Sequence, residues 1–343
     1  MGTSLPRYLE LKVHQAVLER VYEGIIIIGV HNRSAPSIIF AGEKQDKPFN
    51  WQRPTAQVID NYLYIECFPG HDHVEHYAEI ISTYLGTRQR LGDILTPPSK
   101  VSYRPSTLPE IRHALNSTNL REFPRDMDTV VLGHIDRLDR LTGPVAWHST
   151  GPFDWIVQKF GHRTVAFLGF RPCFWGDLGG EVVHYLAVQR GAREVIYQGK
   201  LGGVKKGVRP NTWLATGSRS YARRRTVKWD NILAGSVEAA GRAATIVGVH
   251  QTLGSVLHET QGWLASLPGD VDFVDPEIGM MALAAQWNRV GFGYLHIVSD
   301  NVAEKYSEDL SNERMESVLE RRARLYEVVQ DVLGHYLCSP VRI

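Results

Sequence analysis

Two acidic residues near the C-terminus stand at the ends of a predicted helix and the strand that follows it. In PEIGMMALAAQWNRVGFGYLHIVSDN (276–301), Glu277 lies at the helix start and Asp300 lies just after the strand. Pro276 is expected in the first helical turn, because a proline there loses no hydrogen bond. In open α/β sheets, ligands bind at the carboxyl ends of strands. The spacing therefore predicts that Asp300 and Glu277 face a ligand, although either acid alone can be read as a helix cap or a strand terminus.

Short apolar runs rich in β-branched residues recur along the chain and are interpreted as strands. Helical patterns lie between several of them, most clearly at 179–192, where Gly191 ends the helix. This alternation predicts an α/β layer fold, and the continuous apolar strands indicate a sheet covered on both faces. The predicted strands are 25–30, 37–42, 62–67, 129–133, 164–169, 194–199, 245–249 and 294–299.

The composition favours a small-molecule ligand. Lys and Arg number 38 against 37 for Asp and Glu, so the net charge of +1 gives no field that would attract nucleic acid or a membrane surface. The longest apolar run, 25–30, is far too short to span a membrane, and the N-terminus lacks the apolar core of a signal peptide. The three cysteines are odd in number and widely spaced, which fits a reducing compartment. We therefore expect a cytoplasmic protein with no nucleic-acid or membrane partner.

One shift in composition suggests a boundary. The segment 94–110 contains four prolines, which interrupt helices and central strands alike. We predict an N-terminal extension of unknown role at 1–93, a proline-rich connector at 94–125 and the main α/β domain at 126–343.

Four segments of this domain follow one another in an order typical of a known enzyme family. VVLGHIDR (130–137) is similar to a first strand with its G-D-P-x-R phosphate loop, and GAREVIYQGKLGG (191–203) to a strand and glycine turn beside a sugar. VDPEIGMMA matches a helix start that is often written V-[DE]-M-E-x-A. One helix and one strand later, VSD matches the Ser-Asp that follows in such sequences. The C-terminal helical pattern is similar to the closing helix. Together these segments resemble the nucleoside phosphorylase superfamily, which includes purine nucleoside and uridine phosphorylases and methylthioadenosine/S-adenosylhomocysteine nucleosidases.

The resemblance implies a three-layer α/β/α fold with a central mixed, partly closed sheet, to which the N-terminal extension is added. It also implies an enzyme that cleaves the N-glycosidic bond of a nucleoside, with purine or modified nucleosides as the leading class. No cofactor is expected. A homo-oligomer is expected because members of the family are closed assemblies.

The same resemblance assigns roles to the acids. It places Glu277 on the ribose 2′ and 3′ hydroxyls, with Asp275 as a second contact. It makes Asp300, next to Ser299, the catalytic residue, which gives a proton to a purine ring nitrogen or forms a hydrogen bond with it. A free Asp has a pKa near 4, so this role at neutral pH needs a rise of about three units, or roughly 4 kcal/mol. The apolar strand end before Asp300 could supply that rise by excluding water.

The sequence also departs from the family pattern. Phosphorolytic relatives carry Arg before the glycine turn and Ser within it, where this chain has Tyr197 and Lys200. A tyrosine lacks the bidentate fork by which guanidinium binds phosphate, so hydrolysis by water is favoured. Pro276 replaces the usual Met beside the sugar, which favours a modified or bulkier nucleoside. The predicted base pocket is 249–257.

Two other functions stay open. Phosphorolysis, with inorganic phosphate as co-substrate, is one, and a nucleoside-binding protein with little turnover is the other. The residues predicted around the sugar or a phosphate are Gly133, Arg137, Arg171, Tyr197, Gly199 and Lys200.

A histidine cluster offers a competing signal. HDHVEH (71–76) matches the H-x-H-x-[DE]-H run of metallo-β-lactamase-like hydrolases, so His71, His73 and His76 could bind one zinc ion. That fold needs further ligands on later strands, and no comparable cluster follows. We therefore predict no metal site and favour exposed histidines on a surface helix, with a segment that reaches into a neighbouring subunit's site as a further alternative.

Overall fold

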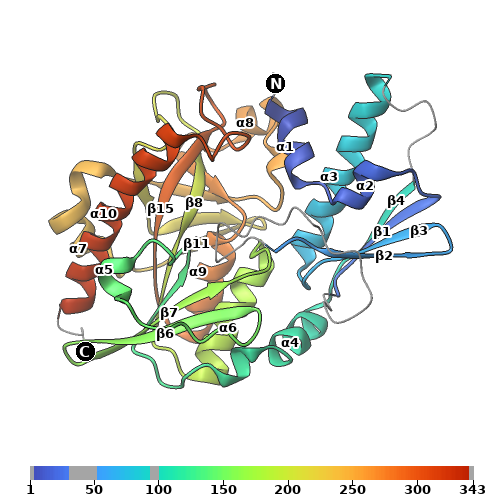
Figure 1. Ribbon diagram of the computed structural model, residues 1–343. Helices are drawn as coiled ribbons and strands as arrows, with labels where there is room; N and C mark the ends of the chain where they lie inside the picture. Colours follow the sequence, from blue (N-terminus) through green and yellow to red (C-terminus); the bar gives the residue numbers. More distant parts are fainter. Residues whose placement is uncertain (1–3, 31–51, 93–99, 340–343) are drawn as a thin grey trace.

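The computed structural model describes residues 4–30, 52–92 and 100–339. Two sheets organise these ranges, a small one near the N-terminus and a large one that forms the main body (Figure 1). The predicted strand 37–42 lies outside the described residues. Within the described ranges, every helix is too short or too polar to span a bilayer.

The small sheet has four strands in the order β2-β3-β1-β4. β1 runs parallel to both β3 and β4, while β2 is antiparallel to β3. The apolar side chains of α1 and α3 pack with those of β1 and β3 in one buried cluster. The elements of this unit are α1 (Ser4–Lys12), α2 (Gln15–Glu19), β1 (Gly24–Ile28), β2 (Thr55–Ile59), β3 (Tyr62–Glu66), α3 (His71–Arg90) and β4 (Lys100–Arg104).

The large sheet is mixed and has eleven strands. Its main path is β11-β10-β13-β14-β8-β15-β9-β12, and β5, β6 and β7 join it through β8. Its strands are β5 (Thr129–Gly133), β6 (Phe153–Phe160), β7 (Arg163–Phe170), β8 (Glu194–Gly203), β9 (Leu214–Thr216), β10 (Arg219–Ala222), β11 (Arg225–Lys228), β12 (Thr245–Val247), β13 (Val249–Thr252), β14 (Val271–Asp275) and β15 (Gly291–Asn301).

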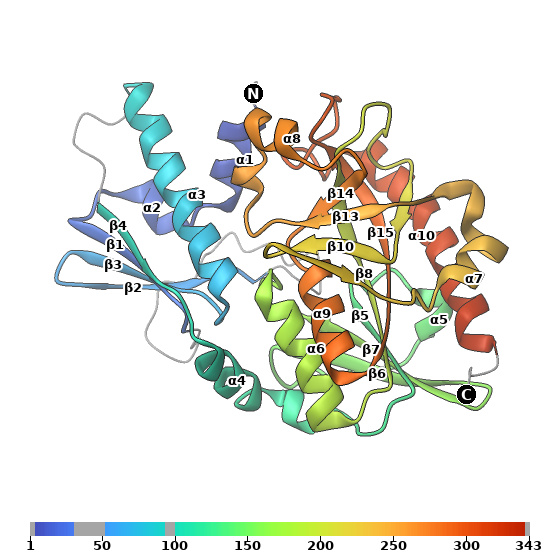
Figure 2. The ribbon, with the colours of Figure 1, turned by 180° about the vertical axis from the view of Figure 1, so that it is seen from behind.

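Helices cover both faces of this sheet (Figures 1 and 2). α6 and α9 pack together on one face, and α10 lies on the other. The α-helices of this part are α4 (Leu108–Asn116), α5 (Asp139–Thr142), α6 (Asp177–Arg190), α7 (Ala234–Ser236), α8 (Gln261–Ser266), α9 (Ile278–Asn288) and α10 (Glu316–Cys338). Short 3₁₀ turns occur at η1 (Asn119–Glu122), η3 (Arg242–Ala244) and η4 (Val256–His258), and a π-helical turn at η2 (Val237–Gly241).

The strand pattern explains this layering. Successive side chains of a strand point to opposite faces, so Val195 of β8 joins the core under α6 and α9 while Ile196 joins the core under α10. Each such fully buried aliphatic side chain contributes about 1.5–3 kcal/mol of hydrophobic free energy. The predicted three-layer α/β/α arrangement with a mixed sheet is confirmed.

The predicted elements are found with shifted ends. The strand expected at 294–299 is the middle of the longer β15, and the one expected at 245–249 is split between β12 and β13. The segment expected as a connector, 94–125, carries regular structure: β4 completes the small sheet beside β1, and α4 packs on α6. The prolines do not prevent this, because Pro109 lies in the first turn of α4, where a proline is tolerated.

Candidate active site

The two acids singled out from the sequence line one cavity. Glu277 precedes α9 and Asp300 lies near the end of β15, and the folded sheet brings both to a cavity of about 140 Å³. The cavity is lined by Tyr8, Lys12, His134, Phe174, Trp175, Tyr197, Lys200, Leu201, Gly202, Val256, Glu259, Val274, Asp275, Pro276, Glu277, Ser299, Asp300, Leu310 and Glu313. Six of the predicted site residues are therefore together here: Tyr197, Lys200, Asp275, Glu277, Ser299 and Asp300.

Glu277 occupies the N-cap position of α9 and is only 5% exposed. The Tyr197 hydroxyl donates a hydrogen bond of 3.4 Å to its Oε2 atom. Burial, and after it the neighbouring Asp275 carboxylate, raises the pKa of Glu277 well above its usual value. Because α9 begins at Ile278, Pro276 precedes the helix instead of opening its first turn, which corrects the sequence prediction.

Asp275 has a structural role in this arrangement. Its Oδ1 atom accepts the backbone N–H groups of Glu277 (3.1 Å) and Ile278 (3.0 Å), which would otherwise have no partner at the start of α9. His250 Nε2 lies 2.8 Å from the same oxygen, and His296 Nε2 lies 3.8 Å from Oδ2. Burial alone would raise the pKa of Asp275, but these histidines and the N–H groups outweigh burial and lower it. Asp275 thus stays ionised and holds Glu277 in place.

Asp300 is presented to the cavity by an irregularity in β15. The pairing register with β8 shifts between Val298 and Asp300, and such bulges re-aim the side chains that follow them. Gly202 lies opposite, where an added Cβ would stand 3.2 Å from Asp300 Oδ2. The Ser299 hydroxyl donates a 2.8 Å hydrogen bond to Asp300 Oδ1, and burial raises the pKa of Asp300. The raised pKa is the direction required of a proton donor.

Lys200, which also lines the cavity, forms an ion pair. Its ammonium group binds Glu313, and Arg322 Nη2 lies 3.0 Å from the same Glu313 oxygen. Arg322, only 7% exposed, also donates from Nε to Asn211 Oδ1 at 2.7 Å. Lys200 and Arg322 therefore share one internal carboxylate, which stands where an external anion would otherwise bind.

A second cavity of about 220 Å³ adjoins the first and shares His134 and Lys200 with it. Arg137 and Arg322 also line this space. The side chain of Arg137 is 61% exposed, and its Nε lies 3.7 Å from Asp136 Oδ2. The predicted phosphate-loop residue Arg137 is thus next to the main cavity, not in it.

The remaining predicted residues lie outside both linings. Gly133 ends β5 with a φ of +119°, and a Cβ there would stand 2.1 Å from the Gln198 carbonyl, so this position requires glycine. Gly199 lies against His296. Arg171 is held by Asp154 through hydrogen bonds of 2.7 and 2.6 Å and lines neither cavity, so its role as a phosphate contact stays a prediction.

Glu259 is a cavity residue that sequence reasoning missed. It lies just beyond the predicted base pocket 249–257, of which Val256 lines the cavity. Burial, and after it the charge of Asp300, raises the pKa of Glu259 well above its usual value. A carboxyl that precedes the short helix α8 carries no local signal of this burial.

The histidines of 71–76 do not form a metal centre. Among the described residues, no group of three or more His, Cys, Asp or Glu side chains could hold a metal ion. The favoured picture of exposed histidines holds only for His71: His73 and His76 are each 4% exposed, because the first turns of α3 pack against the main domain. Burial lowers the pKa of His73 to about 4.

Comparison with known proteins identifies the fold. No family model and no curated protein matches the sequence. The chain is similar to the 5′-methylthioadenosine/S-adenosyl homocysteine nucleosidase of Campylobacter jejuni, with 13% identity and a TM-score of 0.50 over 61% of this chain and 99% of that one. A putative methylthioadenosine nucleosidase from Weissella paramesenteroides is 14% identical, with a TM-score of 0.50 over 63% of this chain and 99% of that one. Futalosine hydrolase of Helicobacter pylori is 13% identical, with a TM-score of 0.50 over 61% of this chain and 98% of that one.

The chain has the fold of these solved enzymes, as the sequence motifs predict. Each neighbour is covered almost from end to end, whereas more than a third of this chain lies outside the match. At this identity the likeness concerns the fold, and the chemistry must be argued from the cavity itself.

Proposed function

We propose that this protein cleaves the N-glycosidic bond of a purine or modified purine nucleoside, with water as the nucleophile. The observation that carries the proposal is that Glu277 and Asp300 line one cavity and that burial raises the pKa of both. The nucleosidases among the solved neighbours have this fold, which supports the same reaction class.

The two acids suit the two halves of a nucleoside. Cleavage passes through a sugar that resembles an oxocarbenium ion, while negative charge develops on the departing base. Asp300, whose raised pKa helps it keep a proton, donates that proton to a ring nitrogen of the base as the bond between base and sugar breaks. The oxygen of the water bonds to the sugar carbon, and the proton that the water loses restores the acid form of Asp300. Glu277, fixed at the start of α9 by Asp275, binds the ribose hydroxyls, and its carboxyl group can ionise as the sugar becomes positive. The chemistry uses protein side chains alone, so we propose that it needs no cofactor.

Water is favoured over phosphate as the nucleophile because the cations beside the cavity are already paired with carboxylates. Lys200 and Arg322 both bind Glu313, so a phosphate ion would have to displace a buried carboxylate. Tyr197 stands where phosphorolytic relatives have arginine and donates to Glu277. Arg171 is bound to Asp154.

One observation favours phosphorolysis as the second candidate. The adjoining cavity is lined by three cations, Arg137, Arg322 and Lys200, together with His134. A rearrangement of Glu313 would leave a cationic site there for inorganic phosphate. A nucleoside-binding protein with little turnover is the third candidate.

Product analysis separates these candidates. The purified chain is incubated with a panel of purine nucleosides with and without inorganic phosphate, and the released base and sugar are identified. Free ribose formed equally in both conditions is the expected result. Ribose 1-phosphate formed only with phosphate would instead establish phosphorolysis, and thermal stabilisation without any product would establish a binding protein.

We further propose that the protein is a cytoplasmic homo-oligomer. Trp287 of α9 and Val188 of α6 are 68% and 53% exposed on two helices that pack together, which supports burial of this face between copies. Cys67, Cys173 and Cys338 are free thiols, which supports a reducing compartment. Light scattering of the purified chain measures the molar mass, and a monomer at micromolar concentration would refute the assembly.

A further inference from the structure

The first helix of the chain forms part of the cavity wall. Tyr8 and Lys12 of α1 line the cavity together with Glu259, Asp300 and other residues of the main domain. Tyr8 is only 8% exposed, and the Lys12 ammonium lies 5.5 Å from the centre of its ring. In Figures 1 and 2, α1 lies beside α8 at the edge of the main domain. Although α1 is far from Glu277 in the sequence, it therefore lines the same cavity as Glu277.

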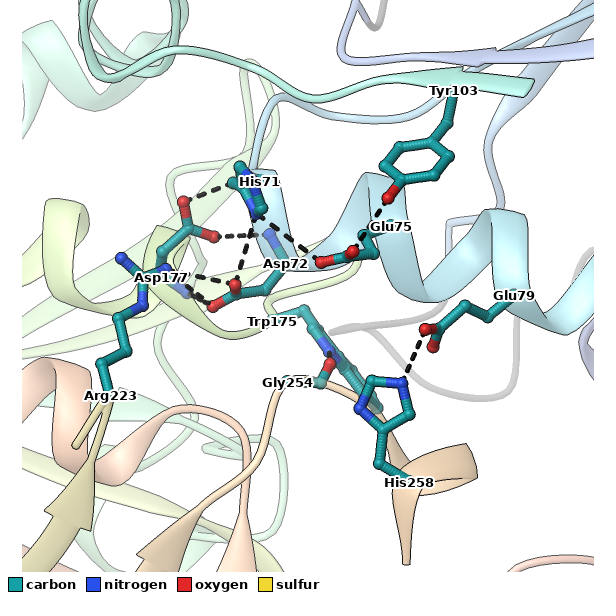
Figure 3. Close-up of polar contacts among 10 residues, drawn as sticks. All are labelled: His71, Asp72, Glu75, Glu79, Tyr103, Trp175, Asp177, Arg223, Gly254 and His258. Atoms are coloured by element: carbon teal, nitrogen blue, oxygen red, sulfur yellow. Dashed lines mark hydrogen bonds and ion pairs between the residues drawn. The ribbon is translucent and has the colours of Figure 1, made fainter.

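A pair of aspartates joins the N-terminal unit to the main domain, at the starts of α3 and α6. Asp177 Oδ1 accepts the backbone N–H of Asp72 at 3.0 Å, and Asp72 Oδ2 accepts the backbone N–H of Asp177 at 2.9 Å (Figure 3). Each carboxylate thus satisfies donors at the other helix start. Arg223 Nη2 lies 3.1 Å from Asp72 Oδ1, which offsets the repulsion between the two acids.

A second group of contacts fixes the loops that carry cavity residues. His76 stacks on the cavity residue Trp175 with ring centroids 4.3 Å apart, and its Nδ1 lies 2.8 Å from Ser255 Oγ. Further along α3, Glu79 accepts from His258 at 2.6 Å (Figure 3). Val256 and Glu259, which line the cavity, follow Ser255 and His258 directly in the sequence. The position of α3 therefore fixes this part of the cavity lining.

We propose that the N-terminal unit is a built-in part of the substrate site and that Tyr8 and Lys12 contact the bound nucleoside. This inference rests on the proposed function. A lysine side chain only donates hydrogen bonds and a tyrosine hydroxyl can donate one, so the part of the substrate that faces α1 carries hydrogen-bond acceptors such as ring nitrogens, carbonyl or carboxylate oxygens. The unit predicted at 1–93 then has a role in substrate selection, supplied by the same chain that carries the acids.

Conservative variants test the contact. Tyr8→Phe removes only the hydroxyl, and Lys12→Met removes the ammonium while it keeps most of the side chain's length. The control is Arg7→Met, a loss of positive charge at an exposed position of the same helix. On a nucleoside that the wild type cleaves, we expect KM to rise about tenfold in each test variant, the equivalent of about 1.4 kcal/mol, with kcat within about twofold. Arg7→Met is expected to match the wild type.

Two results separate this inference from the proposed function. If the wild type cleaves no nucleoside, the proposed function fails before any variant is made. If the wild type is active and both variants keep its KM, only the inference about α1 fails.

Hydrogen exchange gives a readout that needs no variant. We expect the amides of α1 to exchange more slowly when the wild-type protein is saturated with the released base or a non-cleavable nucleoside. Unchanged exchange in α1, with slower exchange at the start of α9, would also overturn the inference.

Discussion

Two groups of charged residues at the cavity differ in how their charge is balanced. The acid group, Glu277, Asp300 and Glu259, lines the cavity with carboxyl groups whose pKa values burial raises. The cation group consists of Lys200, which lines the same cavity, and Arg322, which lines the adjoining one, and both share the carboxylate of Glu313. Burial thus favours the protonated form of the acid group, whereas the charges of the cation group are already compensated.

This difference indicates which groups are available for chemistry. A buried acid with a raised pKa keeps its proton to a higher pH than a free acid does and can pass it to a ligand, whereas a cation in an internal ion pair is less available to an external anion. Asp275 shows the contrast beside the acid group: it is buried next to Glu277, but His250 and backbone N–H groups keep it ionised. We therefore expect substitutions in the acid group to change catalysis and substitutions that affect the cation group to change the nucleophile.

The largest effect is expected for Asp300→Asn. The variant keeps the shape of the side chain and can still accept from Ser299, but it has no proton to give to the leaving base. Loss of a general acid lowers kcat by about 10²–10⁴-fold. Steady-state kinetics on a cleaved nucleoside measures this, with Asp230→Asn, an exposed acid, as the control. Wild-type kcat in Asp300→Asn would remove this residue from the mechanism.

A smaller loss is expected for Glu277→Gln. An amide can still accept from Tyr197, but unlike a carboxyl group it cannot ionise and bind the sugar hydroxyls with a negative charge as the sugar becomes positive. Hydrogen bonds to charged groups contribute about 1.5–3 kcal/mol, so kcat/KM is expected to fall roughly 10- to 100-fold. A 2′-deoxynucleoside should be less sensitive to the substitution than its ribonucleoside. Equal losses on both sugars would contradict the assignment of Glu277 to the hydroxyls.

Glu313→Gln tests the cation group. The substitution leaves Lys200 and Arg322 without their shared carboxylate, so we expect phosphate to bind more than tenfold tighter and to alter the rate of base release. Calorimetric titration with inorganic phosphate measures the affinity. The matched control is Glu320→Gln, an exposed acid of α10, the helix that follows Glu313. Identical phosphate affinity in both variants would show that Glu313 does not block an anion site.

The smallest effect, on stability, is expected for Glu259→Gln. Because the folded protein raises the pKa of Glu259, the native state binds the proton more tightly than the unfolded chain does. The contribution of this group to stability is therefore fully present below the unfolded pKa of about 4.3 and is lost as the pH rises towards the folded pKa. We expect the variant to melt a few degrees above the wild type at pH 7, and the difference to shrink towards pH 4. A difference in Tm that does not change with pH would refute this.

The sequence allowed Glu277, Asp300 and Lys200 to be predicted at the site, but not Glu259 or the ion pair that Lys200 forms. Glu277 and Asp300 each stand at the end of a local pattern, a helix start and a strand end, and the strand-to-helix order placed them at one edge of the sheet. Lys200 could be identified beside the glycine turn, but its partner Glu313 lies 113 residues away in a loop before α10. Such long-range ion pairs have no periodic signal.

The same reasoning explains what was missed in the N-terminal region. The small sheet includes β4, which lies in the segment expected as a connector, and parallel pairing of β1 with β4 joins residues far apart in the sequence. His73 and His76 follow the helical period, but their burial depends on docking against Trp175 and Ser255 of the main domain. The division at 1–93, 94–125 and 126–343 stays a prediction.

A crystal structure of the protein with a non-cleavable purine nucleoside tests the central claim most directly. The account predicts ribose hydroxyls within hydrogen-bond distance of Glu277 and a base nitrogen within hydrogen-bond distance of Asp300, on opposite sides of one ligand. A nucleoside bound in another cavity, or bound here with Asp300 turned away from the base, would contradict it.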